Sequence, residues 1–230
     1  MDTLQVRFHD EQPFADRRQA GKLLAQMLTP FAAEAPVVVG ILRGGIVIGS
    51  EIAGTLNVEL DIALSRKIGA PSNPELALGA VSENGKIFLN RHILSLYPNE
   101  QDYIRQETRR QMDVIKSRQR MYRKIRAKIP LARRTVIVAD DGIATGSTMR
   151  ATLWALRQEN PRRLIAAIPV GPHDTLEELA QDADAIVCVR VPPFFGSIGQ
   201  FYIAFEQLDD ERVIAILESA TAGAKSSSGA

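Results

Sequence analysis

Apolar runs alternate with stretches of helical periodicity along this chain. Five runs consist almost entirely of Val, Ile, Leu and Ala, at residues 37–42, 58–64, 136–139, 164–170 and 185–191. Strands that helices cover on both faces have this nearly continuous apolar composition. Helices are predicted at residues 13–31, 46–56, 148–159 and 175–181. Because strands and helices alternate, the pattern favours an α/β fold with a mainly parallel, five-stranded central sheet flanked by helices.

Residues 67–130 interrupt this alternation and are predicted to form an insertion. Turn-forming residues at 69–75 predict a mobile loop, and Asn-Gly within residues 80–89 predicts a hairpin. Residues 99–128 are predicted to form a long helix. The apolar side of this helix consists of Ile104, Met112, Ile115, Tyr122 and Ile125. Its other faces carry Arg105, Arg109, Arg110, Lys116, Arg118, Arg120, Arg123, Lys124, Arg126 and Lys128. This basic surface is either solvated or a binding surface for an anionic partner.

The composition is that of an ordinary globular protein. The 230 residues carry a net charge of +1, which gives no global reason to expect a nucleic acid or an anionic membrane as partner. No stretch approaches the ~20 apolar residues of a membrane span, and the N-terminus lacks the pattern of a signal peptide, so we expect a cytoplasmic protein. The single cysteine, Cys188, is expected to be a buried thiol. Residues 1–219 are predicted to form one domain, and residues 220–230 a disordered tail.

The third apolar run ends in two adjacent carboxylates, Asp140 and Asp141. Ligands of open α/β sheets bind beyond the carboxyl ends of the strands, where these side chains would project. Paired acids can accept hydrogen bonds from vicinal sugar hydroxyls and can hold a hard cation through water. A short loop then leads into a predicted helix, where free amides and the helix dipole favour an anion. The residues of this predicted phosphate-binding loop are Ala144, Thr145, Gly146, Ser147 and Thr148.

Two further segments follow strand ends. After the first run comes Leu42-Arg43-Gly44-Gly45, in which glycines allow backbone amides close to an oxyanion and arginine adds a bidentate donor. After the second run, Arg66 and Lys67 lead into the predicted mobile loop. These two basic residues are either ligands of an anion or surface charges.

The strand, the two acids and the sequence Gly-Ile-Ala-Thr-Gly-Ser-Thr resemble the motif by which type I phosphoribosyltransferases bind phosphoribosyl pyrophosphate (PRPP). The resemblance implies that Asp140 and Asp141 contact the ribose hydroxyls and hold Mg²⁺ through water. It also implies that residues 144–148 bind the 5′-phosphate. Leu42, Arg43, Gly44, Gly45 and Lys67 would bind pyrophosphate, in the family often across a cis peptide, here Leu42-Arg43. Residues 66–75 resemble a bacterial and archaeal subgroup whose acceptor is poorly defined.

The acceptor is expected under a small hood at residues 191–208. There Phe194 or Phe195 would stack on a base, as in purine enzymes of the family, or would only pack the hood against the core. Hypoxanthine and guanine enzymes of the family carry an aspartate at the first position of the phosphate loop. Here that position is Ala144, which argues against their mechanism and leaves the acceptor's general base without a candidate.

Two functions remain open from the sequence. The favoured one is transfer of the 5-phosphoribosyl group from PRPP to a nitrogenous base, with Mg²⁺ as cofactor and a homodimer as the expected assembly. Catalysis would be mainly electrostatic. It would depend on Arg43, Arg66, Lys67, Asp140 and Asp141. The alternative is a non-catalytic protein that senses PRPP or a nucleotide and regulates a partner, such as RNA bound by the basic insertion.

Overall fold

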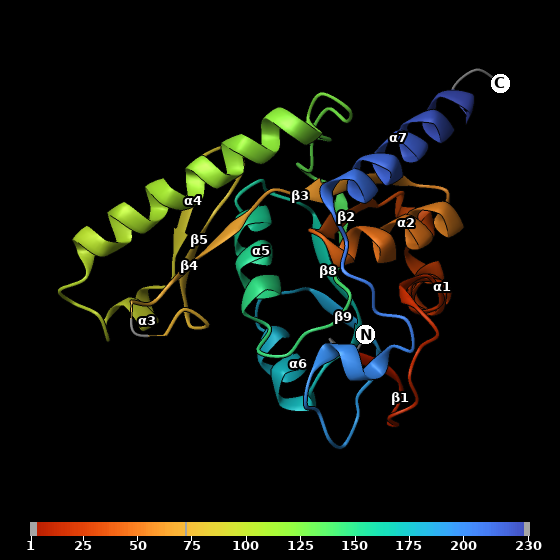
Figure 1. Ribbon diagram of the computed structural model, residues 1–230, viewed down its shortest axis with the longest axis horizontal. Helices are drawn as coiled ribbons and strands as arrows, with labels where there is room; N and C mark the ends of the chain where they lie inside the picture. The colour runs from red at the N-terminus through yellow and green to blue at the C-terminus, as the bar shows by residue number, and fades with distance from the viewer. Residues whose placement is uncertain (1–3, 72, 228–230) are drawn as a thin grey trace.

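A six-stranded parallel sheet forms the centre of the molecule (Figure 1). The computed structural model describes residues 4–71 and 73–227, with residues 221–227 described by their backbone alone. The strand order is β1-β9-β8-β7-β2-β3. The bounds are β1 (Leu4–Phe8), β2 (Val37–Ile41), β3 (Glu59–Ala63), β7 (Thr135–Ala139), β8 (Arg163–Val170) and β9 (Ala185–Arg190). All five predicted strands are present and the α/β class is confirmed. The sixth strand, β1, was not predicted.

Helices cover both faces of this sheet, which explains its nearly continuous apolar strands. One face packs against α1 (Arg17–Leu28), the 3₁₀ segment η1 (Thr29–Glu34), α2 (Gly44–Leu56) and α7 (Asp210–Ser227). The other packs against α5 (Ser147–Arg157) and α6 (His173–Leu179). Along β7, Ile137 belongs to the first core cluster, whereas Val136 and Val138 belong to the second. Both faces of the strand are therefore buried.

The insertion forms a second, antiparallel sheet with the order β4-β5-β6. It comprises β4 (Arg66–Gly69), β5 (Ala77–Val81), β6 (Ile87–Leu89), α3 (Arg91–Leu94) and α4 (Gln101–Tyr122). The predicted hairpin is confirmed as β5–β6, and Gly85 in its turn has a φ of 78°. The rings of Phe88 and Trp154 lie 4.7 Å apart, so this sheet packs against α5. Consequently α5 lies between the two sheets.

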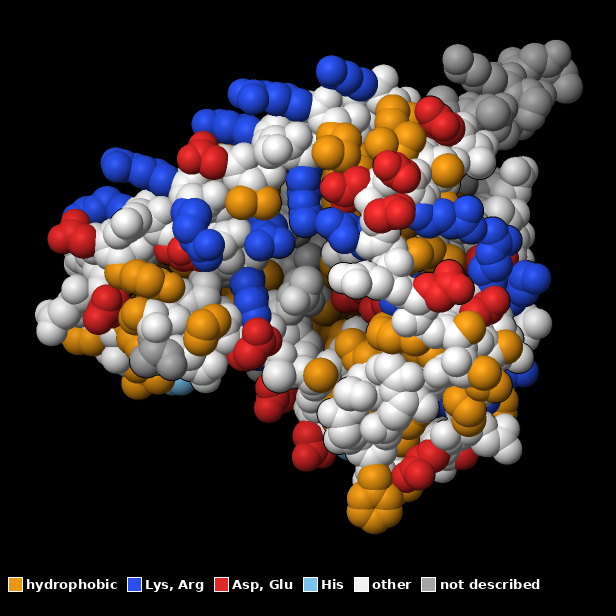
Figure 2. Space-filling view, in the orientation of Figure 1, with side chains coloured by type: hydrophobic (Ala, Val, Ile, Leu, Met, Phe, Trp, Pro, Cys, Tyr) orange, Lys and Arg blue, Asp and Glu red, His pale blue; other side chains and the backbone are white. Residues whose placement is uncertain are grey.

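The apolar side of α4 faces the body of the protein as predicted, with Ile115 and Tyr122 fully buried. Most of its Lys and Arg residues line the outer edge of the molecule (Figure 2). Arg123 is expected on that basic surface, but the structure places it in a buried ion-pair cluster instead. Its guanidinium bonds to Asp61 Oδ1 and Glu83 Oε1, each at 2.6 Å, and all three side chains are largely buried. Arg123 therefore fastens the end of α4 to β3 and to the hairpin.

The C-terminal segment differs from the prediction of a disordered tail from residue 220. Helix α7 continues to Ser227, and residues 228–230 lie outside the described part of the chain. The division into one domain with an insertion stays a prediction. Cys188 is completely buried as expected, and burial raises the pKa of its thiol to about 12. Within residues 4–71 and 73–227, no helix has both the length and the apolar composition needed to cross a bilayer.

Candidate active site

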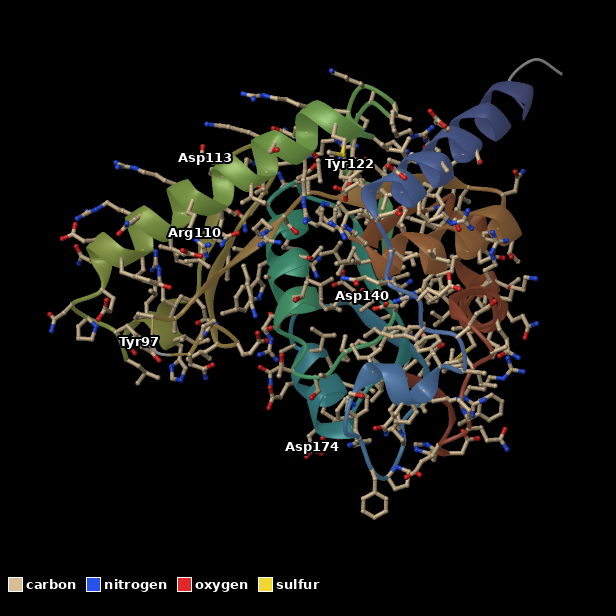
Figure 3. The ribbon with its side chains drawn as sticks, viewed as in Figure 1. Tyr97, Arg110, Asp113, Tyr122, Asp140 and Asp174 are labelled. Carbon is tan, nitrogen blue, oxygen red and sulfur yellow. The ribbon has the colours of Figure 1, made fainter. Side chains whose placement is uncertain are left out.

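The predicted ligand loops meet at one cleft beyond the carboxyl ends of β2 and β7. These strands are neighbours, with Gly40 opposite Ala139, so the loops that follow them lie side by side. The cleft has a volume of about 400 Å³. It is lined by Ile41, Leu42, Arg43, Gly44, Glu75, Asp140, Asp141, Gly142, Ile143, Ala144, Thr145, Gly146, Ser147, Thr148, Met149 and Ile198. Figure 3 shows Asp140 at the centre of the molecule.

The two acids of the cleft differ in environment. Asp141 Oδ2 accepts a hydrogen bond from Arg17 Nε at 2.8 Å, and the Asp141 carbonyl accepts one from the Tyr202 hydroxyl at 2.6 Å. Asp140 Oδ1 accepts a hydrogen bond from the Asp141 amide at 2.9 Å, and the nearby charge of Arg17 also acts on this carboxyl group. Burial, together with the neighbouring charge of Asp141, raises the pKa of Asp140 well above its ordinary value. The pair therefore holds more negative charge than Arg17 compensates.

Glycines allow the loop after β2 to pack directly against this acidic strand end. A side chain at residue 44 would overlap the Asp141 carboxylate. A side chain at residue 45 would overlap the Ala139 carbonyl oxygen and would approach Asp140 Cα to 2.9 Å. The Leu42-Arg43 peptide is cis, as the resemblance implied. The amides at the start of α2 thus lie next to the carboxylates of β7.

The loop after the two acids ends in the first turn of α5. Gly146 caps this helix with a φ of 67°, a left-handed conformation that glycine adopts without strain. The hydroxyls of Thr145 and Ser147 lie 3.2 Å apart. Lys67 reaches the same place from β4, and its Nζ donates to Ser147 Oγ at 3.0 Å. Free amides, two hydroxyls and one ammonium group therefore form an anion site.

A carboxylate from the chain itself lies against this anion site. Glu75 Oε2 accepts from Lys67 Nζ at 3.0 Å, from Ser147 Oγ at 3.2 Å and from Thr145 Oγ1 at 3.4 Å. The hydrogen bond from Lys67 is the main reason why the pKa of Glu75 is lowered. Sequence analysis placed Glu75 at the end of a turn-rich loop and assigned no contact to it.

Comparison with known proteins agrees with this geometry. The phosphoribosyl transferase domain matches residues 15–206. The chain belongs to the phosphoribosyl transferase family. It is 37% identical over 207 residues to two Mycobacterium tuberculosis proteins named as phosphoribosyl transferases of unconfirmed activity, MT0597 and Rv0571c. The match covers 90% of this chain, which spans only 47% of the length of those relatives.

A solved structure also resembles this chain along most of its length. The protein TT1426 from Thermus thermophilus is 44% identical, with a TM-score of 0.85 over 90% of this chain and 99% of that one. The predicted fold, a parallel sheet flanked by helices as in type I phosphoribosyltransferases, is therefore confirmed.

The side chains of Arg66, Phe194 and Phe195 are not among those that line the cleft. Arg66 Nε donates to Gln111 Oε1 at 2.8 Å, and burial is the main cause of its lowered pKa. Phe194 is 77% exposed, whereas Phe195 packs on Phe201 with ring centroids 5.2 Å apart. Phe195 lines a neighbouring cavity of about 420 Å³. The roles given to these residues stay predictions.

Arg43 lies at the cleft, but its side chain is held by the C-terminal part of the chain. Its Nε lies 3.0 Å from Asp210 Oδ1, and its Nη1 donates to the Leu208 carbonyl at 2.8 Å. Asp210 also accepts a bond from the buried Tyr122 hydroxyl at 2.6 Å. The start of α7 thus connects the loop after β2 with the end of α4.

Sequence analysis missed Arg17 and Tyr202, both of which contact Asp141. Arg17 is only 11% exposed, bonds to the Glu206 carbonyl at 2.8 Å, and lies 4.0 Å from the centre of the Phe205 ring. Nothing in the sequence connects Arg17 with an acid 124 positions away. For Tyr202, its place in the predicted hood was the only available signal.

Proposed function

We propose that this protein transfers the 5-phosphoribosyl group from PRPP to a nitrogen atom of a base and releases pyrophosphate. The observation that carries the proposal is the shared cleft. It joins an anion site on α5, two acids at the end of β7 and a glycine loop after β2. A sugar that carries phosphate at one end and pyrophosphate at the other has charges and hydroxyls matching these three parts.

Each part has a role in the proposal. The amides and hydroxyls of residues 144–148 bind the 5′-phosphate. Asp140 and Asp141 accept hydrogen bonds from the ribose hydroxyls and face the positive charge that develops on the ring. The amides after Leu42-Arg43 bind pyrophosphate. Arg43 joins them after release from Asp210, at low cost, since both partners of that pair are more than one-third exposed (39% and 38%).

Mg²⁺ fits the donor set of this cleft. Asp140 and Asp141 offer the hard carboxylate oxygens that Mg²⁺ binds directly or through water. The charge of Asp141 helps to raise the pKa of Asp140, and of the two acids only Asp141 bonds to Arg17, so a cation bound here would offset their repulsion. When bound, Mg²⁺ would neutralise charge on the departing pyrophosphate.

The reaction itself requires positioning and electrostatics. A ring nitrogen of the base forms a bond to the anomeric carbon as the bond to the pyrophosphate oxygen breaks, with inversion, and the nitrogen loses its proton. Ala144 supplies no base for that proton. The cleft therefore favours acceptors that lose it to water or to pyrophosphate. The homodimer and the cytoplasmic location stay predictions.

A second candidate, a protein that binds PRPP without turnover, is favoured by two observations. Arg43 bonds to Asp210, and Arg66 bonds to Gln111, so both basic side chains already have partners within the chain. Such a sensor would keep the phosphate and ribose contacts but would not stabilise pyrophosphate as it departs. Binding and turnover therefore have to be measured separately.

The test is incubation of the purified protein with PRPP, Mg²⁺ and a panel of purine, pyrimidine and other nitrogen bases. We expect pyrophosphate release with at least one base, and loss of release in EDTA. The Asp140→Asn, Asp141→Asn double variant should release none, whereas Asp113→Asn on the exposed side of α4 should behave as wild type. Binding of PRPP without release with any base would favour the sensor. Absence of PRPP binding would refute both candidates.

A further inference from the structure

We propose that Glu75 is an internal competitor at the phosphate site, an occupant that the 5′-phosphate of a ligand must displace. The inference rests on the proposed function, because it takes the anion site on α5 as the 5′-phosphate site. It adds that the phosphate affinity of this site is set in part by competition with a carboxylate of the chain itself.

The contacts of Glu75 reproduce those expected of a phosphate oxygen. One carboxylate oxygen, Oε2, receives hydrogen bonds from two hydroxyls of the loop and from the ammonium group of Lys67. These are the side-chain donors of the anion site. A carboxylate carries one charge, whereas a phosphate monoester carries nearly two at neutral pH and offers three acceptor oxygens. The phosphate is therefore the stronger ligand of the same donors.

The backbone holds Glu75 in this place. The connection from β4 to β5 is closed by a bond from the Ala70 amide to the Leu76 carbonyl at 2.9 Å. Within it, the Leu76 amide donates to the Asn73 carbonyl at 3.0 Å, and the Glu75 amide donates to Asn73 Oδ1 at 3.1 Å. Gly69 allows the chain to pass close to Pro74, since a side chain there would come within 2.7 Å of the Pro74 carbonyl oxygen. The turn thus presents the carboxylate to α5.

A phosphate ligand can displace Glu75 at a small cost in free energy. Its side chain is 64% exposed, so the ion pair with Lys67 is largely solvated. Because exposed ion pairs contribute little free energy, loss of the Glu75–Lys67 pair on phosphate binding should weaken the affinity for phosphate by about fivefold at most. Repulsion between Glu75 and an incoming phosphate adds to that factor. An unphosphorylated sugar carries no anion that could replace Glu75 on these donors.

Calorimetric titration of Glu75→Gln with ribose 5-phosphate, ribose and inorganic phosphate tests the inference. We expect ribose 5-phosphate and inorganic phosphate to bind about 3- to 10-fold more tightly to the variant than to wild type at low salt. The difference should shrink at high ionic strength, and ribose should bind neither protein measurably. Glu178→Gln is the matched control, because Glu178 is 66% exposed and pairs at 3.2 Å with Arg150 and not with Lys67. Its affinities should equal those of wild type.

The outcomes separate this inference from the proposed function. Equal or weaker phosphate binding by Glu75→Gln, with normal PRPP binding by wild type, overturns the role of Glu75 and leaves the proposed function intact. Tighter phosphate binding without turnover of any base supports the role of Glu75 and counts against the transferase. Absence of phosphate binding in both proteins overturns both.

Discussion

A methyl group at residue 45 should force apart the two loops that form the cleft. Gly45 lies in the first turn of α2, where alanine alone would favour the helix by about 0.5–1 kcal/mol. Its side chain, however, would lie 2.9 Å from Asp140 Cα and would overlap the Ala139 carbonyl oxygen. These are backbone atoms and cannot rotate away. Relief requires a shift of α2 by roughly 1 Å, and overpacking of this kind costs about 1–3 kcal/mol.

The same helix provides the control. Gly54, near the other end of α2, has no atom within 4 Å of the position that a side chain would take. Gly54→Ala should therefore raise the free energy of unfolding by about 0.5–1 kcal/mol. Gly45→Ala should lower it by up to about 2.5 kcal/mol after the gain in helix propensity is subtracted. In urea unfolding curves the two variants should move to opposite sides of wild type.

Ligand binding should separate the two variants further. A displacement of about 1 Å in a positioning loop can cost on the order of 100-fold in activity. We expect calorimetry to show PRPP affinity lost or strongly reduced in Gly45→Ala and unchanged in Gly54→Ala. If Gly45→Ala were as stable as Gly54→Ala and bound PRPP normally, the close packing of the loop after β2 against Asp140 would be refuted.

Further predictions concern the acids and the basic helix. Asp140→Asn should raise the free energy of unfolding at pH 7. The pKa of the Asp140 carboxyl is raised in the folded protein, so its ionisation destabilises the fold as the pH rises above 3.8, the ordinary pKa of the group. Urea unfolding curves in which the variant keeps its gain below pH 3.8 would contradict this prediction. The double variant Asp140→Asn, Asp141→Asn should bind PRPP at least about tenfold more weakly in calorimetry. Unchanged affinity would show that these acids do not contact the ligand. Arg123→Gln should cost about 3–5 kcal/mol in urea unfolding, because it leaves two buried carboxylates unpaired; a wild-type curve would disprove that pairing. Arg120→Gln with Lys124→Gln should leave turnover unchanged, and loss of a salt-sensitive RNA complex would instead indicate a regulator.

The buried framework could be predicted because its signal is local. Continuous apolar runs located β2, β3, β7, β8 and β9, and the residues directly after two of them identified the cleft. Strand β1 was not predicted because it is a half-buried strand at the edge of the sheet, where it pairs with β9 among the described strands. Its five residues alternate in character and lack the continuous apolar composition that marked the central strands.

Long-range charge pairing could not be predicted. Arg123 was grouped with the solvated basic residues because only its own helix was considered, whereas its partners Asp61 and Glu83 lie 62 and 40 positions away. The pairing of Arg17 with Asp141 was not predicted for the same reason, because the two residues lie 124 positions apart. Hydrophobic periodicity indicates which face of a helix is buried, but it does not show which charge has a buried partner.

The single tryptophan of the chain gives the protein a built-in optical probe. Trp154 lies on α5, the helix that begins at the phosphate loop, and its ring contacts Phe88 of the second sheet. It is 7% exposed, and its indole nitrogen donates to Asp182 Oδ1 at 2.6 Å. Any movement of the β5–β6 hairpin relative to α5 would change the packing and hydration of that one fluorophore. Its emission wavelength and quenching by iodide therefore monitor how the insertion sits against the helix, in unlabelled protein and in real time.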